Sequence, residues 1–225
     1  MFKLNKTQLS EALVLPIIEG GKGIGVSNGI TAGNFAKNHA IGTFSGVNAD
    51  FYDENGNYIA QTYNPNLTRK EKFEQLIKYA IKGAIAQAKI AHDIASGNGR
   101  IHMNVLWEAG GAKRVIEGVL EKTKGLIHGI TCGAGLPYDL AEIATKYKVY
   151  YYPIVSSTRA FSVLWKRAYH KLSLFLGGII YEDPWVAGGH VGLSNKEDPN
   201  RQEDPYTKLT NLRSYMNSVG LKDTA

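Results

Sequence analysis

The chain has 225 residues, of which 44% are hydrophobic and 20% charged, and its formal net charge is +6. This composition is that of an ordinary globular protein with a sizeable core, and it excludes a disordered or fibrous chain. The basic residues are spread along the sequence instead of forming a run, which argues against direct nucleic-acid binding.

The single cysteine, Cys132, cannot form an intrachain disulfide bond and fits a reducing compartment. The N-terminal stretch has no signal-peptide pattern, and no apolar run reaches the roughly 18 residues of a membrane span. We therefore expect a cytoplasmic protein with no membrane partner. Cys132 is interpreted as a packing residue, because it has no obvious partner for a nucleophilic dyad.

Apolar, β-branched runs alternate with amphipathic stretches from the N-terminus onward. Six strands are predicted, at 12–18, 40–47, 100–107, 125–133, 148–157 and 176–183. Helices are predicted at 31–39, after Thr68, at 111–123, at 137–147 and at 158–172. Glu71 follows Thr68 by three residues, which is the spacing of a capping box. The polar tail at 194–225 is expected to contain a helix.

This alternation predicts parallel βα units, in an α/β fold whose sheet is covered on both faces. A doubly wound sheet and a (β/α)8 barrel are the two candidates. The barrel is favoured because four strands end in loops that carry glycine or polar ligand groups, and barrel sites gather from many strand ends. Only six units are found where a barrel has eight. We therefore predict one incomplete TIM-type barrel domain over residues 1–225, truncated at its C-terminus.

The predicted strand ends carry the candidate binding residues. Gly20, Gly21 and Lys22 lie in a glycine-rich loop that either cradles a phosphate or flat ring or is simply a flexible rim loop. Asn104 ends the third strand, as a ligand contact or as a core amide. Two further glycines, Gly133 and Gly135, end the fourth strand.

His190 is the candidate catalytic residue. It follows Gly188 and Gly189 in a loop after the sixth strand, and an imidazole titrates close to neutral pH. No metal-ligand spacing surrounds it, so no metal is expected. The other histidines are interpreted as structural or surface residues: His39, His92, His102, His128 and His170.

Five motifs, in order, resemble the nitronate monooxygenase (2-nitropropane dioxygenase) family: PIIEGGKGIGVS, HMNVLW, GAGLPYDL, PIVSSTRA and AGGHVG. The resemblance implies a TIM barrel that binds FMN and oxidises nitronates or nitroalkanes with oxygen. By the same resemblance His190 is the catalytic imidazole. Gly20, Gly21, Lys22, Asn104, Gly133 and Gly135 would bind or shape the site of the flavin, and bare main chain at Gly188 and Gly189 would let its ring approach closely.

The sequence departs from the family at Glu19, where glutamine is usual, at Lys22, where methionine is usual, and at Asp183, where glycine is common. Two other functions stay open. One is an FMN-type enoyl-acyl-carrier-protein reductase, which shares the AGGH loop. The other is a catalytically silent chain that lacks the strands on which the cofactor phosphate sits. A homodimer that supplies this phosphate site is a further expectation.

Overall fold

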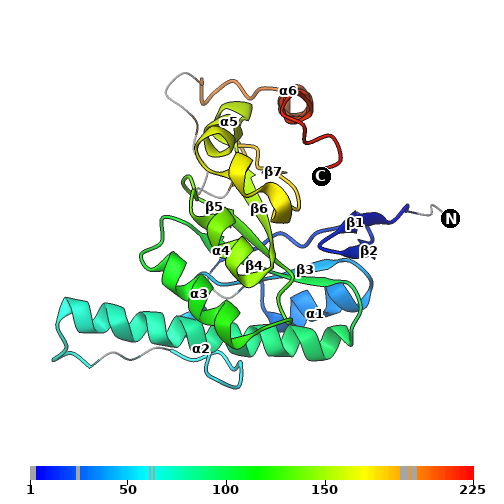
Figure 1. Cartoon of the computed structure of the whole chain (residues 1–225). Helices are drawn as coiled ribbons and strands as arrows, with labels where there is room; N and C mark the ends of the chain where they lie inside the picture. The colour runs from blue at the N-terminus through cyan, green and yellow to red at the C-terminus, as the bar shows by residue number, and fades with distance from the viewer. Residues whose placement is uncertain (1–3, 24–25, 61, 63, 188–192, 194–196) are drawn as a thin grey trace. The chain divides into compact units, whose positions relative to one another are not determined.

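The computed structural model describes residues 4–23, 26–60, 62, 64–187, 193 and 197–225 (Figure 1). The chain divides into two compact units, and each is described by itself. The first comprises residues 1–105 and 109–131, and the second comprises residues 106–108 and 132–225. None of the helices in these described residues is both long enough and apolar enough to cross a membrane.

The main sheet has five strands in the order β3-β4-β5-β6-β7, so each strand lies beside its successor in sequence. The strands are β3 (Ile41–Ser45), β4 (Arg100–Leu106), β5 (Gly129–Gly133), β6 (Tyr150–Val155) and β7 (Ile180–Tyr181). β3 pairs with β4, and β6 with β7, in parallel. The fold is therefore a curled parallel α/β sheet that corresponds to an incomplete barrel, as the sequence predicts.

The predicted strand 12–18 is correct only in part. Ala12–Val14 forms β2, which pairs antiparallel with β1 (Thr7–Leu9) in a hairpin. The chain then bends, and residues 15–19 run parallel to β3. Three backbone bonds hold them there: Leu15 N to His39 O, Ile41 N to Ile17 O and Glu19 N to Ile41 O. One apolar run thus pairs with two different strands, antiparallel to β1 and parallel to β3. Its hydrophobicity alone does not show where one pairing ends and the other begins.

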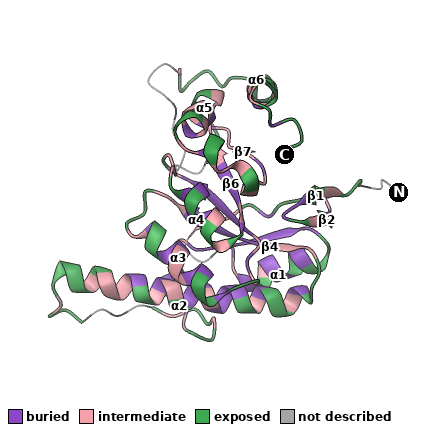
Figure 2. Cartoon of the chain, in the orientation of Figure 1, coloured by how far each residue is buried: buried purple, intermediate pink, exposed green. Residues whose placement is uncertain are grey.

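The long helix of the first unit starts where the capping signal places it. α2 (Arg69–Ala95) follows N-cap Thr68, whose hydroxyl accepts from Glu71 N, and the Glu71 carboxylate accepts from Thr68 N at 2.8 Å. α1 (Gly29–Lys37) runs beside α2, and the sides that face each other are buried (Figures 1 and 2). The remaining helices of this unit are η1 (Ala49–Phe51) and α3 (Ala112–Lys122).

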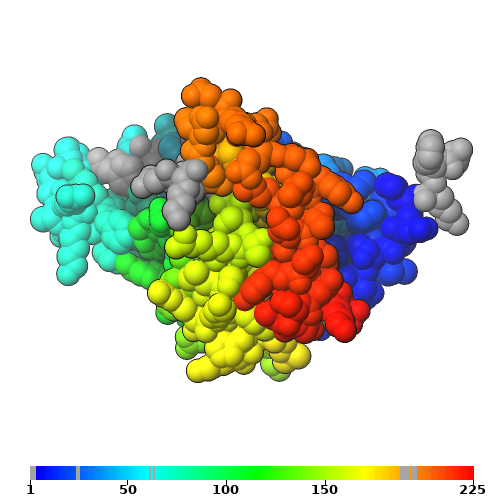
Figure 3. All heavy atoms as spheres, turned by 90° about the horizontal axis from the view of Figure 1, so that it is seen from above, coloured from blue at the N-terminus to red at the C-terminus, as the bar shows by residue number. Residues whose placement is uncertain are grey.

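The helices of the second unit are shorter than predicted. α4 (Leu140–Tyr147) starts after N-cap Asp139, so Pro137 precedes the helix instead of beginning it. α5 (Thr158–Arg167) ends before 172 and continues into the 3₁₀ turns η2 (Tyr169–Lys171) and η3 (Ser173–Phe175). The tail contains the expected helix, α6 (Pro205–Ser218), which packs against α5 (Figure 3).

Candidate functional site

The glycine-rich loop after residue 19 is closed by Ser27, whose side chain is buried. The Ser27 hydroxyl accepts from Lys22 N at 2.9 Å and donates to Gly20 O at 3.2 Å. Ser27 O in turn accepts from Ser45 N, at the end of β3. These bonds fix residues 20–22 next to the sheet, with the Gly20 and Lys22 residues exposed. The described part of this loop is therefore held by hydrogen bonds to Ser27, and its role as a ligand cradle stays a prediction.

Asn104 lies near the C-terminal end of β4 and is only 6% exposed. Its Nδ2 donates to Thr131 Oγ1 on β5 at 3.3 Å, and its backbone O accepts from Gly46 N. Its side chain also covers Gly21, since a Cβ built on that glycine would lie 2.2 Å from Asn104 Cβ. The structure thus brings Gly21 and Asn104 into contact, and their expected roles toward a flavin stay predictions.

Gly20 and Gly21 differ in what surrounds them. Around Gly20 a Cβ would meet no atom of the described residues within 4 Å, so this side of its main chain is open. At Gly21 that space is taken by Asn104, and the need for glycine there is explained by packing within the protein. Of the two, Gly20 offers the open main-chain surface against which a planar ring can lie.

Glu19 is a buried carboxyl directly before this loop. Its Oε2 accepts from Thr43 N on β3 at 2.9 Å. Burial raises the pKa of Glu19, while hydrogen bonds from the Thr31 side chain and the Thr43 backbone and the charge of Lys22 act in the opposite direction. Glu19 therefore ties the loop to β3 and α1.

Gly133 and Gly135 belong to the second unit. A Cβ on Gly133 would lie 3.0 Å from Ile154 Cβ on β6, a tight contact. Gly135 has φ +110°, a conformation that favours glycine, and the space on its Cβ side is occupied by Glu108. Both glycines are explained by local packing and backbone conformation, and their expected role in shaping a flavin pocket stays a prediction.

Gly188, Gly189 and His190 lie outside the described residues. The role of His190 as catalytic imidazole is therefore still a prediction. Within the described part of the chain, no group of three or more His, Cys, Asp or Glu side chains is arranged to hold a metal ion.

Two of the histidines interpreted as structural lie in the first unit, where His102 is buried and His128 is half-buried. His102 Nε2 and Ser10 Oγ are 3.0 Å apart, and His128 Nδ1 accepts from Ile101 N at 3.1 Å. Burial lowers the pKa of His102 to about 3 and that of His128 to about 4. Cys132 is buried, and burial raises the pKa of its thiol above the usual range, so it is an unreactive packing residue.

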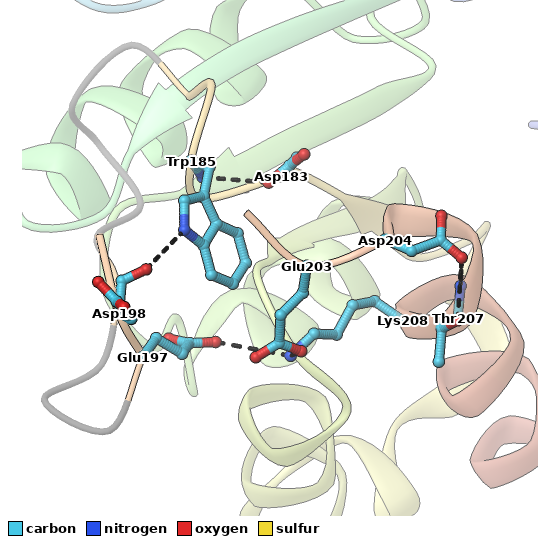
Figure 4. A network of polar contacts seen from close by, with 8 residues as sticks. All are labelled: Asp183, Trp185, Glu197, Asp198, Glu203, Asp204, Thr207 and Lys208. Atoms are coloured by element: carbon cyan, nitrogen blue, oxygen red, sulfur yellow. Dashed lines mark hydrogen bonds and ion pairs between the residues drawn. The ribbon is translucent and has the colours of Figure 1, made fainter. Parts of the chain in front are cut away.

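The sequence analysis missed a polar network in the second unit, drawn in Figure 4. Asp183 accepts from Trp185 N at 3.0 Å, and the Trp185 indole donates to Asp198 O at 3.1 Å. Lys208 on α6 forms ion pairs with Glu197 and Glu203. The sequence analysis noted Asp183 as a departure from the family. Lys208 lies 25 residues further along the chain, and no motif around it indicated that it would form ion pairs in this network.

The fold and these residues define the class of this chain as a curled parallel α/β fold of the TIM-barrel type. Among solved structures, the chain is similar to FabK from Thermotoga maritima, with a TM-score of 0.51 and 12% sequence identity. The match covers 89% of this chain and 47% of FabK, so this chain spans about half the length of that structure. No family model and no curated protein matches the sequence.

Proposed function

We propose that this chain is part of an FMN-dependent oxidoreductase of the nitronate monooxygenase-like superfamily. The observation that carries the proposal is the arrangement at residues 20–22: bare main chain at Gly20 beside the buried Asn104 amide, near the C-terminal end of a strand. In barrels the binding residues gather at this end of the strands. The likeness to FabK supports the fold in which such a site forms.

The described residues fit a flavin in part. Gly20 leaves room for a flat ring, and Asn104 combines a donor and an acceptor in one side chain. Lys22 adds an exposed positive charge suited to an anionic cofactor or substrate. FMN, when bound, supplies the redox step of the reaction. The roles of Gly133, Gly135, Gly188 and Gly189 toward the flavin stay predictions from the sequence.

His190 is the proposed catalytic residue. A neutral imidazole can accept the α-proton of a nitroalkane or donate a hydrogen bond to the nitro group of a nitronate. The leading substrate class is therefore nitronates and nitroalkanes, with oxygen as co-substrate. Reduction of an enoyl thioester carried by acyl carrier protein is the second candidate, because it uses the same AGGH loop and the same barrel fold.

Titration of FMN with the purified chain tests the proposal directly. We expect quenching of flavin fluorescence with one FMN per chain or per dimer. Gly20→Ala places a methyl group on the proposed ring surface, and we expect it to weaken FMN binding at least about tenfold while the fold is unchanged. Fluorescence that stays unquenched at high protein concentration would show that the chain is silent toward FMN.

Turnover assays separate the two substrate classes. Oxygen consumption with propionate 3-nitronate or 2-nitropropane supports nitronate oxidation, whereas NAD(P)H oxidation with a crotonyl thioester supports the reductase. In either case we expect His190→Ala to lower turnover by about 10²–10⁴, the range of general-base assistance, with little change in FMN content. Equal activity of the variant would remove His190 from the mechanism.

A further inference from the structure

Glu19 pairs with β3 through both its main chain and its side chain. Ile41 N donates to Ile17 O at 3.0 Å, and Glu19 N donates to Ile41 O at 2.9 Å, as in a regular parallel ladder. The next bond of such a ladder would run from Thr43 N to Glu19 O. In this structure the Glu19 carboxylate accepts from Thr43 N instead, with Oε2 at 2.9 Å. The side chain therefore takes the place of a main-chain carbonyl, and the regular ladder ends at this residue.

The chain beyond this point is released from β3. Ser45 N, a later donor on the same strand, is occupied by Ser27 O at 2.8 Å. Residues 20–23 lie instead in the loop that the Ser27 hydroxyl closes through Lys22 N and Gly20 O. Gly20 is exposed, and a Cβ on it would meet no atom of the described residues within 4 Å. The open side of Gly20 thus follows from where the ladder ends.

The charge of the Glu19 carboxyl lies next to that of Lys22. Glu19 is only 8% exposed, and the elements packed against it, β3 and α1, present the uncharged Thr43 and Thr31 to it. Burial raises the pKa of Glu19, whereas the two hydrogen bonds and the charge of Lys22 act in the opposite direction. When the carboxyl is ionised, its charge offsets that of Lys22. An anion is then attracted to the loop less than it would be by the lysine alone.

We infer that Glu19 is the positioning residue of the candidate ligand site: its carboxylate ends the ladder with β3 and so holds residues 20–22 in the conformation that leaves Gly20 open. The negative charge of Glu19 also lowers the affinity of this loop for an anionic ligand such as a phosphate group. Glu19 touches no reacting group and acts through the loop. The identity of the ligand rests on the proposed function, whereas the positioning role rests on contacts between described residues.

Hydrogen exchange of the FMN-free chain tests the positioning role. In Glu19→Ala the Thr43 amide loses its acceptor, and we expect it to exchange at least about tenfold faster. The Lys22 amide should also exchange faster, because its bond to Ser27 depends on the conformation of the loop. Glu19→Gln keeps a side-chain acceptor and should keep both amides slow. Glu121→Gln, at an exposed position of α3, removes the same charge elsewhere in the first unit and should change neither amide.

Three results would overturn the positioning role. Unchanged exchange of the Thr43 amide in Glu19→Ala would show that the carboxylate does not hold this donor. Faster exchange of Thr43 with an unchanged Lys22 amide would show that Glu19 serves the strand and not the loop. If Glu19→Ala fails to fold, the Thr43 amide signal decides: it should follow the titration of the Glu19 carboxyl in the wild type and not in Glu19→Gln, and a wild-type signal that does not titrate is the third such result.

Inorganic phosphate, followed through the Lys22 amide signal, gives a readout that a purely structural role would not move. At pH 8 we expect Glu19→Gln to bind phosphate about threefold more tightly than the wild type, because one negative charge beside the loop is lost. As the pH is lowered to 5, the wild-type carboxyl takes up a proton, and the ratio of the two dissociation constants should fall toward one. The ionisation of phosphate is common to both proteins and cancels in this ratio.

The controls separate this charge effect from the proposed function. Glu121→Gln should bind phosphate as the wild type does at every pH. A ratio that is independent of pH, weaker binding by Glu19→Gln, or no phosphate effect on the Lys22 signal in any of these proteins would overturn the charge effect. A chain that shows the expected phosphate ratio but does not bind FMN would refute the proposed function and leave the role of Glu19 standing.

Discussion

Gly20 and Gly21 are neighbours with opposite surroundings, and the difference decides what each can do. The Gly21 main chain is covered by the Asn104 side chain, whereas Gly20 faces open space. A glycine that packs against protein atoms serves the fold, and a glycine with a bare surface is available to a ligand. Of these two glycines, Gly20 is therefore the candidate for contact with a ring.

Gly21→Ala is expected to lower the free energy of unfolding by about 1–3 kcal/mol, the usual cost of an overpacked site. The new Cβ would lie 2.2 Å from Asn104 Cβ, so either the loop or β4 must shift. Urea denaturation measures the change. Gly20→Ala is the matched control and should stay within about 0.5 kcal/mol of the wild type. Equal effects of the two substitutions would show that Asn104 does not fill the space beside Gly21.

At the scale of elements, the turn of the β1–β2 hairpin has a backbone conformation that its residues do not favour locally. Its two turn residues, Ser10 and Glu11, have φ +46° and +60°, a left-handed conformation that non-glycine residues avoid. Tertiary bonds explain why it persists. Arg100 Nε donates to Ser10 O at 2.6 Å, Arg100 Nη2 donates to Glu11 O, and Ser10 Oγ contacts His102. The capping box of α2, in contrast, is a local signal that the structure reproduces.

Glu11→Gly is expected to raise the free energy of unfolding by about 0.5–1 kcal/mol, because glycine adopts the left-handed conformation without a Cβ clash. Chemical denaturation at neutral pH measures the gain. Ser10→Gly makes the comparison informative: it relieves the same backbone cost but loses the contact of Ser10 Oγ with His102, so we expect no gain. A destabilised Glu11→Gly protein would contradict this account of the turn.

At the scale of the whole molecule, the buried His102 and the half-buried His128 of the first unit make stability depend on pH. His102 and His128 have ordinary pKa values of 6.5 when unfolded and about 3 and about 4 when folded. Above pH 6.5 both are neutral in either state and contribute no dependence. As the pH falls below 6.5, the two histidines bind protons in the unfolded chain but not in the folded chain. The free energy of unfolding therefore decreases.

Between pH 7 and pH 5 we expect the free energy of unfolding to drop by about 2 kcal/mol from His102, at about 1.4 kcal/mol per pH unit below 6.5, and to drop further from His128. Denaturation curves at the two pH values measure the drop. His102→Gln should show a smaller drop than the wild type, and His39→Gln, at an exposed position, the same drop. A wild-type protein equally stable at both pH values would contradict the burial of these side chains.

The sequence by itself determined the features that arise from local pattern. The βα alternation gave the fold class, and the Thr68–Glu71 spacing placed the start of α2, because strand hydrophobicity and caps depend on residues close in sequence. It also proposed Gly21 and Asn104 as flavin-binding residues; the structure shows them in contact with each other, and their role toward a flavin stays a prediction.

Only the tertiary structure decided which residues far apart in sequence contact one another. The run 12–18 is divided between a hairpin and a parallel ladder, since β1 pairs with its first part and β3 with its second. Gly21 is a packing glycine and Gly20 an open one because Asn104, more than 80 residues later, covers one and not the other. Lys208 pairs with Glu197 and lies near the ring of Trp185 for the same reason: these partners are set by the path of the chain, which no local pattern encodes.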